Sequence, residues 1–152
     1  MGFLTVFSET GCPHSGCLLE YSGSFEWLSF MPRAGSFFDV FPGGNYGTID
    51  TSDRETAIDT YARFRISDDV LSKGRNTTIA DYAAATYGLF INDCCSFSSD
   101  LSKNCGLKIP PTAFMPSVLV EALVMNNYSN MTHQNKKPYP WIIYKKPPKE
   151  SK

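Results

Sequence analysis

The most informative segment of this chain reads Asn92-Asp93-Cys94-Cys95-Ser96-Phe97-Ser98. Either Asn92 or Asp93 can begin a helix, because a short polar side chain accepts a hydrogen bond from the free N–H groups of the first turn. Gly106 follows as a C-terminal stop. Between these signals, side chains recur on one stripe at helical spacing: Cys94, Phe97, Ser98, Leu101 and Cys105. The segment predicts an amphipathic helix over 94–104 with Cys94 in its first turn.

A cysteine at that position suits nucleophilic chemistry. The unpaired N–H groups and the positive end of the helix dipole favour thiolate over thiol, and the same groups can hold an oxyanion. An imidazole would complete what acyl transfer requires. We expect His133, in a polar segment, to be solvated, whereas His14 begins a predicted strand behind Pro13. On these residues alone, a packing role for Cys94 and a structural role for His14 stay open.

Upstream of this helix the sequence predicts a small antiparallel sheet. Apolar runs predict strands over 3–7, 14–20 and 25–31, and turn residues separate them at Gly11-Cys12-Pro13 and Tyr21–Ser24. Residues 33–50 are rich in glycine and aromatic side chains, which predicts an ordered loop.

Three further elements are expected. The capping box Ser52-Asp53-Arg54-Glu55, followed by apolar residues at helical spacing, predicts a helix over 53–66, with a polar break over 67–78. A second helix is expected over 117–125, and an aromatic strand over 141–144.

The length of the chain allows one domain, and its charge distribution separates an acidic body from a basic tail. With 152 residues and 42% hydrophobic content, the chain can bury one sizeable core. Its net charge of -1 conceals an acidic body and a tail of lysines and prolines. We expect one domain over 1–132 and a basic, Pro-rich C-terminal segment over 133–152. That segment lacks arginine, the usual base-reading side chain, so we expect no nucleic-acid partner.

The cysteine count argues for a reactive thiol. Five cysteines form an odd set, so at least one thiol is expected to be free, although Cys12 with Cys17 and Cys95 with Cys105 are conceivable disulfides. Zinc is disfavoured because no later CxxC pair completes a ligand set with Cys12, His14 and Cys17. No metal or other cofactor is expected. No apolar stretch is long enough to span a bilayer, and we expect the first residues to form a strand and not a signal peptide.

The run from Tyr87 to Ser98, continuing through Leu101 and Gly106 to Ile109-Pro110, resembles the Y-x-L-x-x-N-x-C-x-x-F…G-x-x-I/L-P block of permuted NlpC-like and papain-like proteins. These include lecithin:retinol acyltransferase-like proteins, PPPDE isopeptidases and bacterial toxin-associated hydrolases. They carry a histidine on an early strand, which Pro13-His14-Ser15-Gly16 resembles. The resemblance covers about residues 12–111. It implies an α+β fold of the permuted papain-like (NlpC) type, with a small antiparallel sheet against the nucleophile-bearing helix and further helices.

The resemblance also implies roles for individual residues. Cys94 would be the nucleophile, ahead of its neighbour Cys95, and His14 the base. A third group that orients the imidazole would fall near Glu26, although a dyad without a third member stays open. Asp93 is expected to cap the helix. The loop that ends at Tyr46, with Trp27 and Phe30, would line the substrate groove.

The function implied is a cysteine hydrolase that cleaves an amide bond through a thioester. The specific expectation is a bacterial cell-wall peptide (peptidoglycan) amidase, cytoplasmic until a secretion system delivers it to a rival's periplasm, with a possible immunity protein as inhibitor. The alternatives are a lipid acyltransferase or phospholipase, an isopeptidase acting on a ubiquitin-like tail, and a binding module without activity.

Overall fold

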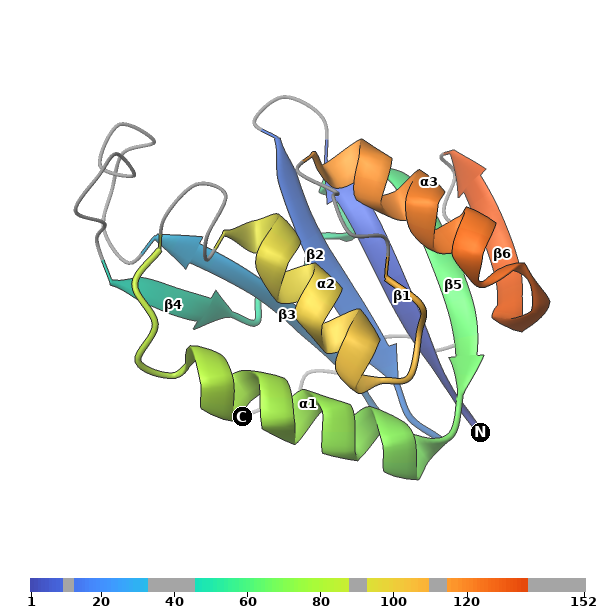
Figure 1. The fold of residues 1–152 in the computed structure, drawn as a ribbon, viewed down its shortest axis with the longest axis horizontal. Coiled ribbons are helices and arrows are strands. Elements are labelled where there is room, and N and C mark those ends of the chain that lie inside the picture. Colours follow the sequence, from blue (N-terminus) through green and yellow to red (C-terminus); the bar gives the residue numbers. More distant parts are fainter. Residues whose placement is uncertain (10–12, 33–45, 88–92, 110–114, 137–152) are drawn as a thin grey trace, which may run out of the picture.

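The computed structural model of the protein describes residues 1–9, 13–32, 46–87, 93–109 and 115–136, the last six by backbone alone. Within these ranges an antiparallel sheet carries three helices on one face (Figure 1). The strand order is β4-β3-β2-β1-β5-β6, with β4 joined to β3 by a separate ladder. The α+β class and the antiparallel sheet under the helix at 94–104 agree with the prediction.

The first three strands form the predicted meander. They are β1 (Gly2–Glu9), β2 (His14–Glu20) and β3 (Phe25–Pro32). Tyr21 donates its N–H to the carbonyl of Ser24 at 2.7 Å and so closes the predicted turn between β2 and β3. The short strand β4 (Gly47–Asp50) pairs with β3. The predicted turn at Gly11-Cys12 and the first part of the loop predicted over 33–50, residues 33–45, lie outside the described residues. The last part of that loop prediction is wrong, because residues 47–50 form β4.

The predicted helix over 53–66 is wrong. Most of this segment is strand β5 (Ile58–Ile66), which pairs with β1. Its second half, Ala62-Arg63-Phe64-Arg65-Ile66, alternates apolar and charged residues, and this period of two matches a strand. The capping box produces only the 3-10 turn η2 (Glu55–Ala57), in which the carboxylate of Asp53 accepts the N–H of Glu55 at 2.9 Å.

The predicted polar break over 67–78 is also wrong, because helix α1 (Asp68–Tyr82) begins there. Ser67 caps this helix by accepting the N–H of Val70 at 3.4 Å. Its buried stripe contains small or polar side chains, which hides the apolar period: Leu71, Gly74, Thr78 and Tyr82.

Helices α2 (Cys94–Asn104) and α3 (Pro116–Asn126) confirm the helices predicted over 94–104 and 117–125. Asp93 caps α2, since its Oδ1 accepts the N–H of Ser96 at 2.8 Å. Gly106 follows with φ of +85°, the left-handed conformation expected at a helix stop. After η3 (Tyr128–Asn130), strand β6 (Met131–Lys136) pairs with β5 and crosses the expected domain boundary at 132. The predicted strand over 141–144 lies outside the described residues.

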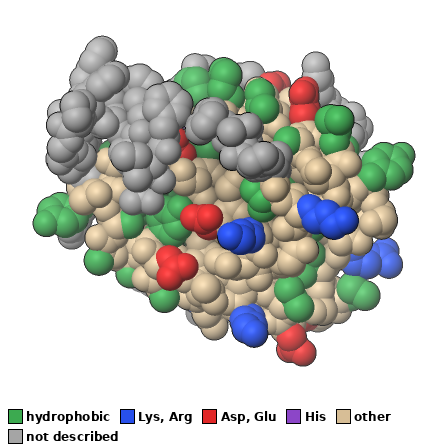
Figure 2. All heavy atoms as spheres, in the orientation of Figure 1, with side chains coloured by type: hydrophobic (Ala, Val, Ile, Leu, Met, Phe, Trp, Pro, Cys, Tyr) green, Lys and Arg blue, Asp and Glu red, His purple; other side chains and the backbone are tan. Residues whose placement is uncertain are grey.

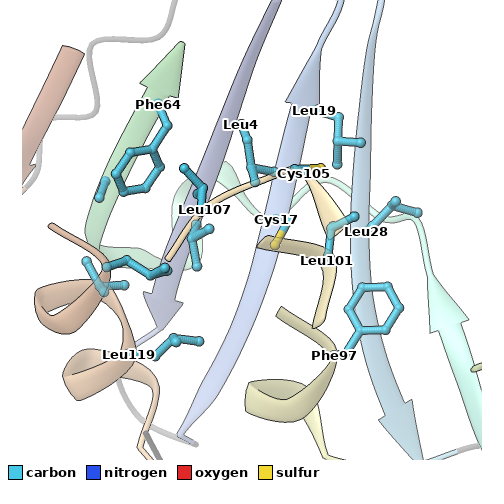
Figure 3. Close-up of a cluster of buried hydrophobic side chains, with 14 of the residues drawn as sticks. Leu4, Cys17, Leu19, Leu28, Phe64, Phe97, Leu101, Cys105, Leu107 and Leu119 are labelled. Carbon is cyan, nitrogen blue, oxygen red and sulfur yellow. The ribbon is translucent and has the colours of Figure 1, made fainter. Parts of the chain in front are cut away.

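The main core lies between the sheet and the helices. Phe97 and Leu101 of α2 point toward the sheet, where they meet Cys17, Leu19 and Leu28 (Figure 3). Both α2 side chains are fully buried, so this contact fixes α2 on β2 and β3.

Successive side chains of a strand point to opposite faces of the sheet, and the second face is also buried. Its apolar cluster contains Phe7, Leu18, Trp27, Ile58 and Tyr61. An ion pair lies within the sheet as well: Arg63 donates Nε and Nη2 to the carboxylate of Glu20 at 2.8 and 3.0 Å. The guanidinium also stacks on the ring of Phe3, 3.7 Å from its centroid.

Candidate active site

Cys94 is the first residue of α2, directly after the capping residue Asp93. The first N–H groups of a helix lack intrahelical partners and lie at the positive end of its dipole. The Cys94 side chain is 6% exposed, so the thiol is largely shielded from water. The helix N-terminus favours the thiolate and burial opposes it, so the position of Cys94 on the helix is the feature expected of an activated thiol.

His14, the first residue of β2, reaches this thiol. Its imidazole hydrogen-bonds the sulfur of Cys94, and the backbone N–H of Ser15 also donates to that sulfur. His14 is 7% exposed. The fold therefore brings together the predicted nucleophile and base, which lie far apart in the sequence.

The two adjacent thiols differ in their electrostatics. The pKa of Cys94 falls from 9.0 to about 5, and the largest cause is a hydrogen bond from the Cys95 thiol. Burial opposes this effect, while the hydrogen bond and charge of His14 and the N–H of Ser15 add to it. The pKa of Cys95 is raised, because it keeps its proton to donate to Cys94 and because it is buried. Of the pair, Cys94 carries the thiolate.

Tyr87 also contacts the Cys94 thiol, although no role was predicted for it. Burial is the largest cause of its raised pKa, followed by the charge of the Cys94 thiolate and a hydrogen bond to it. The phenol oxygen also accepts the backbone N–H of Cys94. The ring of Tyr87 stacks on Phe30, with centroids 5.4 Å apart. The only sequence signal for Tyr87 was its place at the start of the block around Cys94.

The structure does not bring Glu26 to the imidazole. Glu26 pairs with Leu19 near the far end of β2, and its carboxylate accepts from Nε and Nη2 of Arg75 on α1 at 2.9 and 2.8 Å. The Nε2 atom of His14 is buried and has no hydrogen-bond partner in the part of the chain that the structure describes. Within that part no carboxylate meets this nitrogen, and Glu26 is a structural ion-pair residue.

The three side chains expected in a substrate groove lie in different environments. Phe30 is fully buried among Tyr82, Tyr87 and Phe97. Trp27 is 5% exposed and packs edge-on against Phe7 on the second face of the sheet. These two are core residues, contrary to the expectation.

Tyr46, in contrast, is 66% exposed. It forms a β-bridge with Thr86, the residue before Tyr87. Of the three expected groove residues, Tyr46 is the one placed beside the site and open to a ligand.

The other described cysteines lie in the core. Cys17 and Cys105 are free thiols, and burial raises the pKa of each to about 12. Cys95 is free as well, so the conceivable disulfides of Cys95 with Cys105 and of Cys12 with Cys17 are not formed. Among the described residues, no group of three or more histidine, cysteine or acidic side chains could hold a metal ion.

No helix in the described ranges is both long and apolar enough to cross a membrane. Searches of family models, curated proteins and solved structures found no match to this chain. The functional assignment therefore depends on the geometry and chemistry of the site.

Proposed function

We propose that this protein is a cysteine amidase with Cys94 as nucleophile and His14 as base. One observation carries the proposal: the Cys94 thiol lies at a helix N-terminus against an imidazole, with its pKa lowered to about 5. Thiolate character and an adjacent imidazole are the two requirements of nucleophilic catalysis by cysteine.

The reaction follows from these groups. The Cys94 thiolate attacks the amide carbonyl carbon, and the negative charge moves to the carbonyl oxygen. The Tyr87 hydroxyl, which hydrogen-bonds the sulfur, supplies a hydrogen bond for that oxyanion once the sulfur has given up its charge, and the backbone N–H of Cys94 holds the phenol oxygen in place. As the C–N bond breaks, the imidazolium of His14 protonates the leaving amine. His14 then deprotonates a water that hydrolyses the thioester, which releases a carboxylic acid and regenerates Cys94.

For the substrate we propose a peptide of the bacterial cell wall, on the resemblance of the block around Cys94 to permuted papain-like hydrolases. The permuted papain-like fold itself and delivery as a secreted effector, with an immunity protein as inhibitor, belong to the same proposal. Figure 2 shows acidic and basic side chains interspersed on one face of the molecule.

The test is incubation of the purified protein with peptidoglycan fragments, followed by mass spectrometry of the products. The expected result is a new amine and carboxylate pair with wild type and with Cys105→Ala, and no product with Cys94→Ala or His14→Ala. Equal cleavage by wild type and Cys94→Ala would refute the proposal. If neither wild type nor any variant cleaves the fragments, the proposal of a cell-wall substrate is excluded.

One observation favours the lipid alternative, in which the same dyad transfers an acyl chain. Helix α3 and its ends expose several apolar side chains: Met115, Val118, Met125 and Tyr128. Exposed apolar side chains of this kind can rest on a lipid surface, and on α3 the exposed Glu121 lies between Val118 and Met125 on the same face. Retention of a labelled acyl chain on Cys94 after exposure to phospholipid vesicles would support this alternative, and an unlabelled Cys94 would exclude it.

A further inference from the structure

Three buried polar side chains cross the contact between β2 and α2. Ser15 and Cys17 of β2 and Ser98 of α2 are each 0% exposed. The Ser15 hydroxyl donates to Oγ of Ser98 at 3.0 Å, and Ser98 also hydrogen-bonds the thiol of Cys17. We call these three residues the polar seam. It lies inside an otherwise apolar contact that includes Phe97 and Leu101.

The polar seam determines how α2 sits on β2. Apolar side chains attract without a preferred direction, so an apolar contact tolerates small shifts of a helix along a strand. A buried hydroxyl, in contrast, costs free energy unless it is hydrogen-bonded. Sliding α2 by one residue, a rise of about 1.5 Å, breaks a 3.0 Å contact between Ser15 and Ser98. The seam therefore selects one register of α2 on β2.

The same register brings the dyad together. Ser15 follows His14 on β2, and its backbone N–H donates to the Cys94 sulfur. Ser98 lies four residues after Cys94, one helical turn away on the same side of α2. A rigid shift of α2 along β2 that breaks the contact between Ser15 and Ser98 therefore also displaces Cys94 relative to His14.

We propose that Ser98, together with Ser15, is a positioning residue that holds the nucleophile helix in register with the histidine strand. The inference rests on the proposed cysteine chemistry and extends it to residues that touch no substrate. Ser102 provides a matched control, because it is a fully buried serine of the same helix. Its hydroxyl donates to the carbonyl of Ser98 in its own helix at 2.7 Å and does not take part in the seam.

The experiment measures the pH midpoint of Cys94 alkylation by iodoacetamide, mapped by mass spectrometry, in proteins whose fold is checked by circular dichroism. We expect Ser98→Ala and Ser15→Ala each to raise the midpoint by about one unit or more, since a displaced thiol loses the hydrogen bonds that favour the thiolate. The double variant should add nothing further, and Ser102→Ala should keep the wild-type midpoint.

A wild-type midpoint in Ser98→Ala or in a folded Ser15→Ala would overturn the inference, as would additive shifts in the double variant. Loss of the fold in both single variants would also overturn it, because the seam would then support the whole domain. Because alkylation by iodoacetamide needs no amide substrate, the measurement does not depend on knowing what the protein cleaves. An ordinary midpoint in wild type would instead refute the proposed function, so the two failures are distinguishable.

Discussion

The pH dependence of Cys94 alkylation is the sharpest prediction of the site geometry, and His14→Ala is the perturbation that tests it. The wild-type thiol, with its pKa near 5, is largely thiolate above that pH and loses the thiolate as pH falls through it. The His14 substitution removes one hydrogen bond and one positive charge, while the contributions of Cys95 and Ser15 remain. A neighbouring opposite charge typically lowers a pKa by about 1–3 units, so the midpoint should rise to roughly 6–8.

The rate is a less direct measure than the midpoint. At about pH 4, a midpoint near 7 in place of 5 lowers the thiolate fraction roughly a hundredfold, but a more basic thiolate is about eightfold more nucleophilic, so the net rate falls about tenfold. The assay is therefore a full iodoacetamide profile from about pH 4 to pH 10, with labelled peptides identified by mass spectrometry.

His133→Ala, a change of the other histidine, is the control and should keep the wild-type profile. An unchanged midpoint in His14→Ala would refute the reasoning, because the imidazole would then contribute nothing to the thiolate. A wild-type midpoint near the ordinary value of 9.0 would refute it as well.

Three further predictions concern neighbouring residues. Cys95→Ala should raise the alkylation midpoint of Cys94, because the hydrogen bond from Cys95 is the largest cause of the low Cys94 pKa. Cys95→Ser keeps a hydrogen-bond donor at this position and should raise the midpoint less. Equal alkylation profiles in the two variants would contradict this prediction. Glu26→Gln should leave that midpoint unchanged, and a shift would restore Glu26 as a member of the site. Glu20→Ala should lower the unfolding free energy, measured in urea, by about 3–5 kcal/mol because it leaves the buried Arg63 without this carboxylate; a loss below about 1 kcal/mol would contradict that assignment.

The sequence predicted the elements whose signals were local. The α2 helix had a capping residue, an apolar stripe and a terminal glycine, and all three appear in the structure. The first three strands were apolar runs between turn residues. Cys94 and His14 could be predicted as site residues for the same reason, because local sequence signals mark the start of a helix and the start of a strand.

The segment from 53 to 82 was misread because two periodicities competed in it. Apolar residues at helical spacing predict a helix over 53–66, whereas the alternation after Ala62 predicts a strand, and the pairing of β5 with β1 satisfies the strand. The stripe of α1 contains Gly74 and Thr78, so an amphipathic pattern was absent. A Cβ on Gly74 would come within 2.6 Å of the Cys105 sulfur, which shows that close helix packing, not hydrophobicity, selects this residue.

The supporting residues of the site could not be read from the sequence because their roles depend on contacts between distant segments. The hydrogen bond from Ser15 to Ser98 joins β2 to α2 and leaves no periodic signal. Glu26 was assigned by its distance along the chain from His14, whereas strand pairing places it near Arg75.

The central claim is that Cys94 forms a thioester with the acyl part of an amide substrate. The most direct measurement is acid quenching of the protein during its reaction with cell-wall peptide fragments, followed by mass spectrometry of the peptide that contains Cys94. We predict an acyl adduct whose fragment ions place it on Cys94 and not on Cys95, and no adduct in Cys94→Ala. Turnover of substrate with the adduct on another residue, or with undiminished rate in Cys94→Ala, would contradict it.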